Sequence, residues 1–229
     1  MSNQNGKDVA GTVRVLLVDD HSVVRFGIRY SLQDRPRFKI VGEAADYATA
    51  RAAVVALQPD LIIQDLMLAG HGGVDLIREW LDLSPASRVL VLSQHPESVF
   101  AERALRAGAR GYVMKSEDAT ELLAAIEVVA DGEFYLSHDM NQSLLRSFGQ
   151  RPGAPAPDSA PEGALSDREQ HIFLLLGQGL STGDLARKLN VSVKTIGAHR
   201  ENIKARLGLR DAAQLEAAAR SFALRRETA

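Results

Sequence analysis

The chain has 229 residues, a formal net charge of −2 at pH 7 and 45% hydrophobic residues, and it contains no cysteine. This length and apolar fraction suit two ordinary domains with cores of their own, and the lack of cysteine excludes disulfide and thiolate chemistry. The polar stretch 1–12 lacks the apolar centre of a signal peptide, and no apolar run approaches the roughly 20 residues that span a bilayer, so we expect a soluble cytoplasmic protein.

Short apolar runs alternate with amphipathic segments along residues 12–132. The predicted strands are 13–18, 38–43, 60–64, 87–92 and 111–114, and the helices that follow them are 22–33, 47–57, 73–83, 97–107 and 118–131. This alternation predicts an α/β domain with a five-stranded, doubly wound parallel sheet.

Polar side chains stand at the ends of four of these strands. Asp19 and Asp20 follow the first strand, Asp65 the third, Ser93 the fourth and Lys115 the fifth. Parallel strands joined by right-handed crossovers have their carboxyl ends at one edge of the sheet. We therefore expect these side chains to meet there.

Phosphoryl transfer to a carboxylate is the chemistry that suits this set of side chains. An attacking carboxylate approaches a polyanion, so the site needs a divalent cation and fixed positive donors. Oxygen ligands select Mg²⁺, which Asp20 and Asp65 could bind directly and Asp19 through water. Lys115 would pair with the transferred group, Ser93 would hydrogen-bond to it, and Asp65 as nucleophile would become an acyl phosphate.

Each of these residues alone has an ordinary structural explanation. Asp20 or His21 could cap the helix that begins near Ser22. Lys115 could be a solvated loop lysine, and Ser93 could be a turn residue. The joint occurrence at successive strand ends favours a site.

Residues 133–164 are predicted to be a linker that starts with a short helix near 138–148. Four of the eight prolines of the chain lie in 149–163, a composition that cannot form a core and behaves as a semi-stiff tether. The charge also changes sign here: residues 1–164 carry 16 Lys and Arg against 22 Asp and Glu, whereas 165–229 carry 11 against 7. The C-terminal domain, 165–225, is therefore basic.

This second domain has the pattern of a small all-α helix-turn-helix fold. Ser166 and Glu169 form a capping-box pattern at the start of a first helix. A short helix begins at Ser181, a turn follows at 190–192, and a longer helix covers 193–207.

The longer helix is the predicted DNA-contacting element. Seven basic residues and one acid lie between Arg187 and Arg210, and on a helix-turn-helix this concentration favours DNA phosphates over a merely solvated face. Ile196, Ile203 and Leu207 are expected to share its inner face. The residues expected to contact DNA are Lys194, Thr195, Gly197, Ala198, Arg200, Glu201 and Lys204, with Gly197, Arg200, Glu201 and Lys204 together on the outer face.

Two further expectations concern single positions in this domain. His199 falls near the inner face, so we interpret it as a packed or phosphate-facing residue and not as a metal ligand. The last helix carries an apolar stripe of Leu215, Ala219 and Phe222, of which about half is expected to be core.

The strand-end motifs resemble the receiver domain of two-component response regulators over about residues 13–131. The segments that carry this resemblance are Leu17-Val18-Asp19-Asp20-His21, Asp65 with Gly70, Leu92-Ser93, and Gly108-Ala109-Arg110-Gly111-Tyr112-Val113-Met114-Lys115. The resemblance implies a flavodoxin-like sheet, Asp65 as phosphoacceptor, and Mg²⁺ held by Asp19, Asp20, Asp65 and the Met67 carbonyl. It further implies Lys115 as phosphate partner and Ser93 with Tyr112 as a switch pair, although Tyr112 by itself is expected to be a half-buried core aromatic.

Three positions near the expected site depart from the family or vary within it. Ala69 stands where the family usually has a proline before the glycine, which implies a less rigid loop. Met67 and His95 occupy positions that influence the lifetime of the acyl phosphate.

The second domain resembles the LuxR-type DNA-binding domain over about residues 165–222. The segments that carry this are Leu165-Ser166-Asp167-Arg168-Glu169, Gly179-Leu180-Ser181, Leu185-Ala186, Leu189, Ser192-Val193-Lys194-Thr195-Ile196, His199-Arg200, Ile203 and Leu207-Gly208. Gly197, Ala198 and Glu201 depart from it, because relatives often present basic or larger side chains there.

Together the two resemblances indicate a regulator of the NarL/FixJ class. They imply a transcription regulator, not an enzyme, controlled when a sensor histidine kinase phosphorylates Asp65. The implied partners are double-stranded DNA, the kinase, a second copy after phosphorylation with the last helix pairing two DNA-binding domains, and RNA polymerase as a further candidate, with no membrane partner.

Two alternatives stay open on the sequence. An atypical regulator of the same architecture would act without phosphorylation, and Met67, Ala69 and His95 are compatible with it. A phosphatase of the haloacid dehalogenase type also uses a strand-end Asp, but it needs an Asp-x-Asp motif that Asp19-Asp20-His21 lacks.

Overall fold

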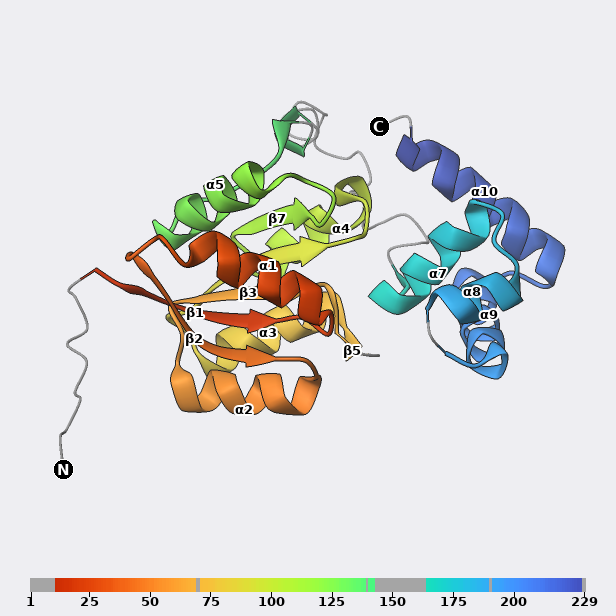
Figure 1. The fold of residues 1–229 in the computed structure, drawn as a ribbon. Helices are drawn as coiled ribbons and strands as arrows, with labels where there is room; N and C mark the ends of the chain where they lie inside the picture. The colour runs from red at the N-terminus through yellow and green to blue at the C-terminus, as the bar shows by residue number, and fades with distance from the viewer. Residues whose placement is uncertain (1–10, 69–70, 139, 143–163, 190, 228–229) are drawn as a thin grey trace. The chain divides into compact units, whose positions relative to one another are not determined.

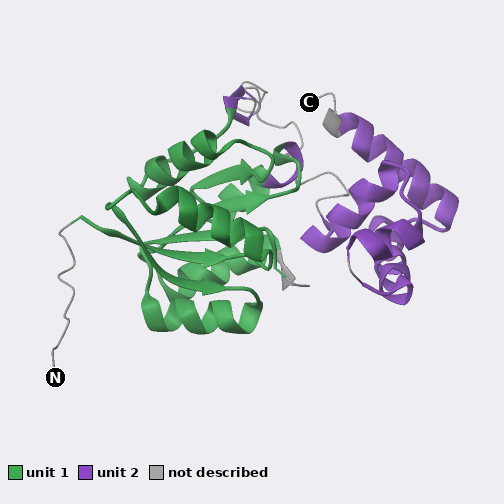
Figure 2. Cartoon of the chain, in the orientation of Figure 1, with its two compact units in different colours: residues 1–97, 101–137 green, residues 98–100, 138–229 purple. Residues whose placement is uncertain are grey.

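The computed structural model describes all residues except 1–10, 69–70, 139, 143–163, 190 and 228–229 (Figure 1). The chain divides into two compact units, residues 1–97 with 101–137 and residues 98–100 with 138–229 (Figure 2). None of the helices in the described part is both long and apolar enough to cross a membrane.

The first unit is built on a parallel sheet with the order β2-β1-β3-β6-β7. Its strands are β1 (Val13–Val18), β2 (Phe38–Ala44), β3 (Leu61–Asp65), β6 (Arg88–Ser93) and β7 (Gly111–Met114). The helices of this unit are α1 (Ser22–Leu32), α2 (Tyr47–Leu57), α3 (Gly73–Leu83), α4 (Glu97–Arg106) and α5 (Ala119–Ala130). The predicted α/β fold with five parallel strands is confirmed, and each predicted element is present with its ends shifted by at most one residue.

Two very short strands were not predicted. β4 (Met67–Leu68) and β5 (His71–Gly72) pair antiparallel after β3. Two residues are too few to show a hydrophobic period, so the sequence pattern carries no signal for them.

Apolar side chains cover both faces of the sheet. The helices α1 and α5 lie on one face of the sheet (Figure 1). On this face, strand residues such as Leu17, Ile63 and Leu92 pack with Ile28 and Ile126 in one buried cluster. Successive side chains of a strand alternate between faces, so the neighbours of these residues point to the side of α2 and α3. Burial on both faces explains why the strands are continuous apolar runs.

Part of the predicted linker lies outside the described residues. Residues 138 and 140–142 are helical, which agrees with the start of the helix expected at 138–148, and residues 143–148 are not described. Before this point, Tyr135 bridges Gly111 in parallel, so the chain after α5 returns to the edge of β7.

The second unit contains α7 (Asp167–Gly177), α8 (Thr182–Lys188), α9 (Val193–Leu207) and α10 (Ala212–Glu227). A capping box begins α7, where Ser166 accepts a hydrogen bond from the Glu169 backbone N–H and its own N–H donates to the Glu169 side chain. Gly208, with φ +65°, ends α9 in the left-handed conformation that favours glycine. The predicted helix-turn-helix is therefore present as α8 and α9.

The last helix packs closely on α7. The rings of Phe173 and Phe222 lie 5.4 Å apart, and a Cβ atom added at Gly177 would come within 2.2 Å of the Ala219 carbonyl oxygen. Leu215, Ala219 and Phe222 are at most 2% exposed. The expectation that only half of this stripe is core is wrong, because the small domain uses all of it to bury α7.

Candidate functional site

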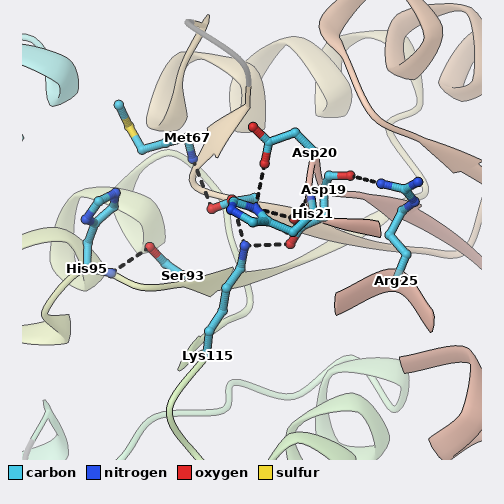
Figure 3. Close-up of polar contacts among 9 residues, drawn as sticks. Asp19, Asp20, His21, Arg25, Met67, Ser93, His95 and Lys115 are labelled. Carbon is cyan, nitrogen blue, oxygen red and sulfur yellow. Dashed lines mark hydrogen bonds and ion pairs between the residues drawn. The ribbon is translucent and has the colours of Figure 1, made fainter. Parts of the chain in front are cut away.

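Three charged side chains converge where β1, β3 and β7 end (Figure 3). The Nζ atom of Lys115 lies 2.7 Å from Oδ2 of Asp65 and 2.7 Å from Oδ2 of Asp19. Each of these side chains is at most 7% exposed. The predicted convergence of strand ends is thus confirmed for these residues, and it makes a buried cluster with one cation and two carboxylates.

Burial gives Asp65 the character of a reactive carboxyl group. Loss of solvent raises its pKa, the charge of Asp19 acts in the same direction, and Lys115 opposes both. The backbone N–H of Met67 donates to Oδ1 of Asp65 over 3.2 Å, which orients the carboxylate. A carboxylate that water solvates poorly is a better nucleophile and a better base than an exposed one.

The turn after β1 places two more groups beside this pair. His21 Nδ1 lies 2.7 Å from Oδ1 of Asp20 and 3.1 Å from Oδ1 of Asp19, and the His21 backbone N–H donates to Asp19 Oδ1 over 2.8 Å (Figure 3). His21 occupies the N-cap position of α1 but makes no side-chain capping bond. From its position in the sequence, His21 was expected only to cap α1. Its place directly after Asp19-Asp20 is the signal that could have included it in the site.

Arg25 holds this turn from the other side. Its guanidinium donates to the backbone oxygen of Asp19, and its Nε donates to Oε2 of Glu43 over 3.0 Å. The side chain is 16% exposed, so the pair is partly shielded from water. No sequence motif marks Arg25, because its partners come from β1 and β2.

The donor set fits a divalent cation. One ligand atom from each of Asp19, Asp20, His21 and Asp65 lies within 4.8 Å of the others. Carboxylate oxygens are the ligands that Mg²⁺ prefers, and Asp20, which is 34% exposed, leaves one side of the cluster open to water. Met67 follows Asp65 by two residues at the same edge. Ala69, where a departure from the family was expected, and the neighbouring Gly70 lie outside the described residues.

The predicted switch residues both contact the backbone of His95. Ser93 is fully buried, and its Oγ accepts from the His95 N–H over 3.1 Å. The Tyr112 hydroxyl donates to the His95 carbonyl over 2.8 Å, and the side chain is 1% exposed. Tyr112 is therefore fully buried, and the expectation of a half-buried side chain is wrong. Both residues meet at the loop that leads into α4.

The helix-turn-helix presents part of the predicted set on its surface. Lys194, Thr195, Ala198 and Glu201 are exposed on α9, and Gly197 is half-buried. Val193, Asn202, Ala205 and Arg206 are also exposed on α9, and Asn202 lies four residues after Ala198 on the same side of the helix. The exposed part of α9 therefore mixes small, polar and charged side chains.

Two predicted outer-face residues have partners inside the domain. Arg200 is 16% exposed and donates to Oγ1 of Thr182 over 3.3 Å and to Oε1 of Glu216 over 3.4 Å. Lys204 is 19% exposed and lies 2.9 Å from Glu201. The expectation that Arg200 shares a free outer face with Glu201 is wrong, since α8 and α10 enclose its guanidinium.

The inner face of α9 is largely as predicted. Ile196 and Ile203 are fully buried, and Leu207 is half-buried. Burial lowers the pKa of His199, and its Nδ1 has no hydrogen-bond partner among the described residues. His199 therefore packs within the domain, with its Nδ1 shielded from water.

Comparisons with known proteins agree with both parts of the chain. Residues 15–127 match the family model of the response regulator receiver domain, and residues 163–219 match that of the bacterial regulatory proteins of the luxR family. The oxygen regulatory protein NreC of Staphylococcus aureus (strain MRSA252) is 33% identical over 205 residues, which cover 89% of this chain and 94% of NreC. NreC of Staphylococcus carnosus (strain TM300) is 32% identical with the same coverage.

Solved structures give the same likeness. A two-component response regulator of the LuxR family from Aurantimonas sp. SI85-9A1 is 39% identical, covers 61% of this chain and 99% of its own, and has a TM-score of 0.56. RcsB from Salmonella enterica serovar Typhimurium, bound to promoter P1flhDC in the presence of the phosphomimetic BeF3-, is 25% identical, with coverage of 90% and 96% and a TM-score of 0.55.

Proposed function

Because the chain belongs to the response regulators that join a receiver domain to a LuxR-type DNA-binding domain, we propose that phosphorylation of Asp65 by a sensor histidine kinase controls its binding to DNA. We assign residues 12–132 to the receiver domain, 133–164 to the linker and 165–225 to the DNA-binding domain. Two compact units that separate between residues 137 and 138 support this division.

The observation that carries the proposal is the buried contact of Asp65 with Lys115 and Asp19. In the transfer, the bond between phosphorus and the imidazole nitrogen of the kinase breaks as a bond from a carboxylate oxygen of Asp65 to phosphorus forms. The raised pKa of Asp65 makes its carboxylate a stronger nucleophile. Lys115, already 2.7 Å from Asp65, would pair with the arriving phosphoryl oxygens.

The donor set is the one expected for Mg²⁺, with Asp20 and Asp65 as direct ligands, Asp19 through water, and the Met67 carbonyl. The ion would offset the negative charge that spreads over the phosphoryl oxygens. Asp19 has a second role, since its Oδ2 lies 2.7 Å from the Lys115 ammonium. The lysine is thus placed before the phosphoryl group arrives, and little reorganisation is needed.

Ser93 and Tyr112 would carry the signal out of the site. A phosphoryl group on Asp65 offers Ser93 a new acceptor for its hydroxyl proton. Since Ser93 Oγ and Tyr112 Oη both hold the backbone of His95, a shift of Ser93 changes the loop before α4. A change in this loop would alter the surface of the receiver domain when Asp65 is phosphorylated.

In the second domain, α9 would enter the major groove of double-stranded DNA. Lys194 and Lys204 would hold phosphates, and Thr195, Gly197, Ala198 and Glu201 would lie near the bases. Arg200 would support α8 and α10 through Thr182 and Glu216 while remaining close to the backbone of the DNA. A homodimer formed after phosphorylation would bring two such helices to two half-sites, with RNA polymerase as a further partner.

The test uses the full chain with acetyl phosphate and Mg²⁺. Intact mass should show one added phosphoryl group that is stable in acid and labile in base. Asp65→Asn should abolish it, and Asp75→Asn, at an exposed carboxylate on α3, should leave it unchanged. Labelling of Asp65→Asn at another site would contradict the assignment.

The regulatory step needs its own measurement. Sedimentation and fluorescence anisotropy on DNA selected by the protein should show dimer formation and tighter binding with acetyl phosphate or beryllofluoride. Equal affinity and equal mass in both states would favour a regulator that acts without phosphorylation.

A further inference from the structure

We propose that the imidazole of His21 is a metal ligand, so that this site binds transition ions such as Mn²⁺ through one nitrogen as well as carboxylate oxygens. The inference rests on the proposed function, because it concerns the same cation site. It differs from that function in the chemical class of ion that the site prefers. An all-oxygen site suits Mg²⁺, whereas an imidazole nitrogen among the ligands favours first-row transition ions over Mg²⁺.

The distances between ligand atoms carry the inference. His21 Nδ1 lies 2.7 Å from Asp20 Oδ1, 3.1 Å from Asp19 Oδ1 and 3.9 Å from Asp65 Oδ2. In an octahedron with metal–ligand bonds of about 2.1 Å, neighbouring ligands lie about 3 Å apart and opposite ligands about 4.2 Å apart. The contact to the direct ligand Asp20 is close to the shorter spacing, and the contact to Asp65 is near the longer one, while Asp19, which would bind through water, makes a further polar contact with Nδ1. Nδ1 therefore stands where a ligand would stand.

The backbone holds His21 in this position. Its N–H is bound to Asp19 Oδ1, and Arg25 grips the Asp19 carbonyl from the other side of the turn. His21 is also the N-cap residue of α1, so the helix restrains the chain immediately after it. A side chain restrained in this way reaches the carboxylates with little loss of conformational freedom.

His21 keeps one side open to solvent. Its side chain is 53% exposed, and the three carboxylates gather around Nδ1. With the proton on the outer ring nitrogen, Nδ1 presents its lone pair to the cluster while Nε2 remains able to bind water. The contrasting explanation is that His21 only donates to Asp20 and orients it, which would leave all metal ligands as oxygen.

The experiment measures nitrogen coordination directly. Mn²⁺ is added to the full chain without phosphodonor, and electron spin echo modulation is recorded with natural and ¹⁵N-histidine protein. We expect a histidine nitrogen coupling that changes with the isotope, is lost in His21→Ala and is retained in His138→Ala, a variant at an exposed histidine outside this cluster. The isotope comparison on unaltered protein does not depend on how any variant folds.

Affinities give an independent readout. Mn²⁺ binding is counted by the signal of the free ion, and Mg²⁺ binding by competition with Mn²⁺. Loss of a residue that only supports a metal ligand typically weakens metal binding by about 10- to 100-fold. His21→Ala should therefore weaken Mn²⁺ binding by at least about tenfold and Mg²⁺ binding by a smaller factor. Transition ions and Mg²⁺ differ in affinity at any site, so the ratio of the two affinities in the unaltered protein does not test the role of His21. The test is how much His21→Ala changes each affinity.

Three outcomes separate this inference from the proposed function. Saturable Mn²⁺ binding without a histidine coupling, or equal losses for Mn²⁺ and Mg²⁺ in His21→Ala, would overturn the role of His21 and leave the phosphoacceptor site intact. A coupling retained in His21→Ala would assign the nitrogen to another histidine and also overturn it. No saturable binding of either ion would contradict the cation site of the proposed function as well.

Discussion

Replacing Gln64 with methionine should stabilise the first unit. Gln64 is 1% exposed in the middle of the sheet, and neither its Oε1 nor its Nε2 has a hydrogen-bond partner among the described residues. It follows Ile63, which packs on the side of α1 and α5, so strand alternation points Gln64 to the opposite face of the sheet. A buried amide in such a place lowers the free energy of unfolding.

The expected gain follows from the cost of unpaired polar groups. Leaving a buried donor or acceptor unsatisfied costs about 1–3 kcal/mol. Methionine has the same unbranched length as glutamine but no amide, so Gln64→Met removes the cost without opening a cavity. The free energy of unfolding should rise by about 1–3 kcal/mol.

Urea unfolding followed by tryptophan fluorescence measures this change. Trp80 is the only tryptophan of the chain and is fully buried on α3, so its signal reports the first unit alone. This matters because a protein with two units need not unfold in one transition. Gln64→Ala serves as the control, because it also lacks the amide but leaves a cavity and should fall below Gln64→Met.

An unchanged or lower midpoint for Gln64→Met, with an unchanged urea slope, would refute the reasoning. It would mean that the amide of Gln64 has partners in solution. A rise for Gln64→Met together with a smaller rise or a fall for Gln64→Ala would support it.

Three other outcomes can be checked. In chelator-containing buffer, the melting temperature of Asp65→Asn should exceed that of the unaltered protein at pH 7 but not below about pH 4. The reason is that the pKa of Asp65 is raised in the folded state, so the stability of the unaltered protein falls as pH rises through the ordinary carboxyl range. A difference in melting temperature that persisted in acid would exclude ionisation of Asp65 as its cause. Phe222→Ala should cost the second unit about 3–5 kcal/mol in thermal unfolding, and a loss below about 1 kcal/mol would contradict its place in the core. Glu201→Ala should raise non-specific DNA affinity and relax the preference at one base pair per half-site. Lys204→Ala should weaken binding to every sequence and reduce the slope of log affinity against log salt concentration by about 0.9. A DNA motif that changes only in Lys204→Ala would reverse the roles of these two residues.

Local sequence patterns were enough for most of the fold. The alternation of apolar runs predicted all five long strands. The charged residues at the ends of β1, β3 and β7 predicted which side chains meet, because the topology of parallel strands leaves only one edge for their carboxyl ends. The contact of Asp65 with Asp19 and Lys115 follows from this rule alone. Ser166 and Glu169 likewise predicted the start of α7, because a capping box is complete within four residues.

Side-chain direction and burial were decided only by the tertiary structure. Tyr112 is fully buried because its hydroxyl reaches the carbonyl of His95, which belongs to another strand-to-helix loop. The guanidinium of Arg200 turns inward because Thr182 and Glu216 come from the helices on both sides of α9. His21 faces three carboxylates that two separate strands bring together. The periodicity of hydrophobic residues along one element determines where that element lies. It carries no information about the partners that distant segments supply, and these partners determine where each polar side chain points.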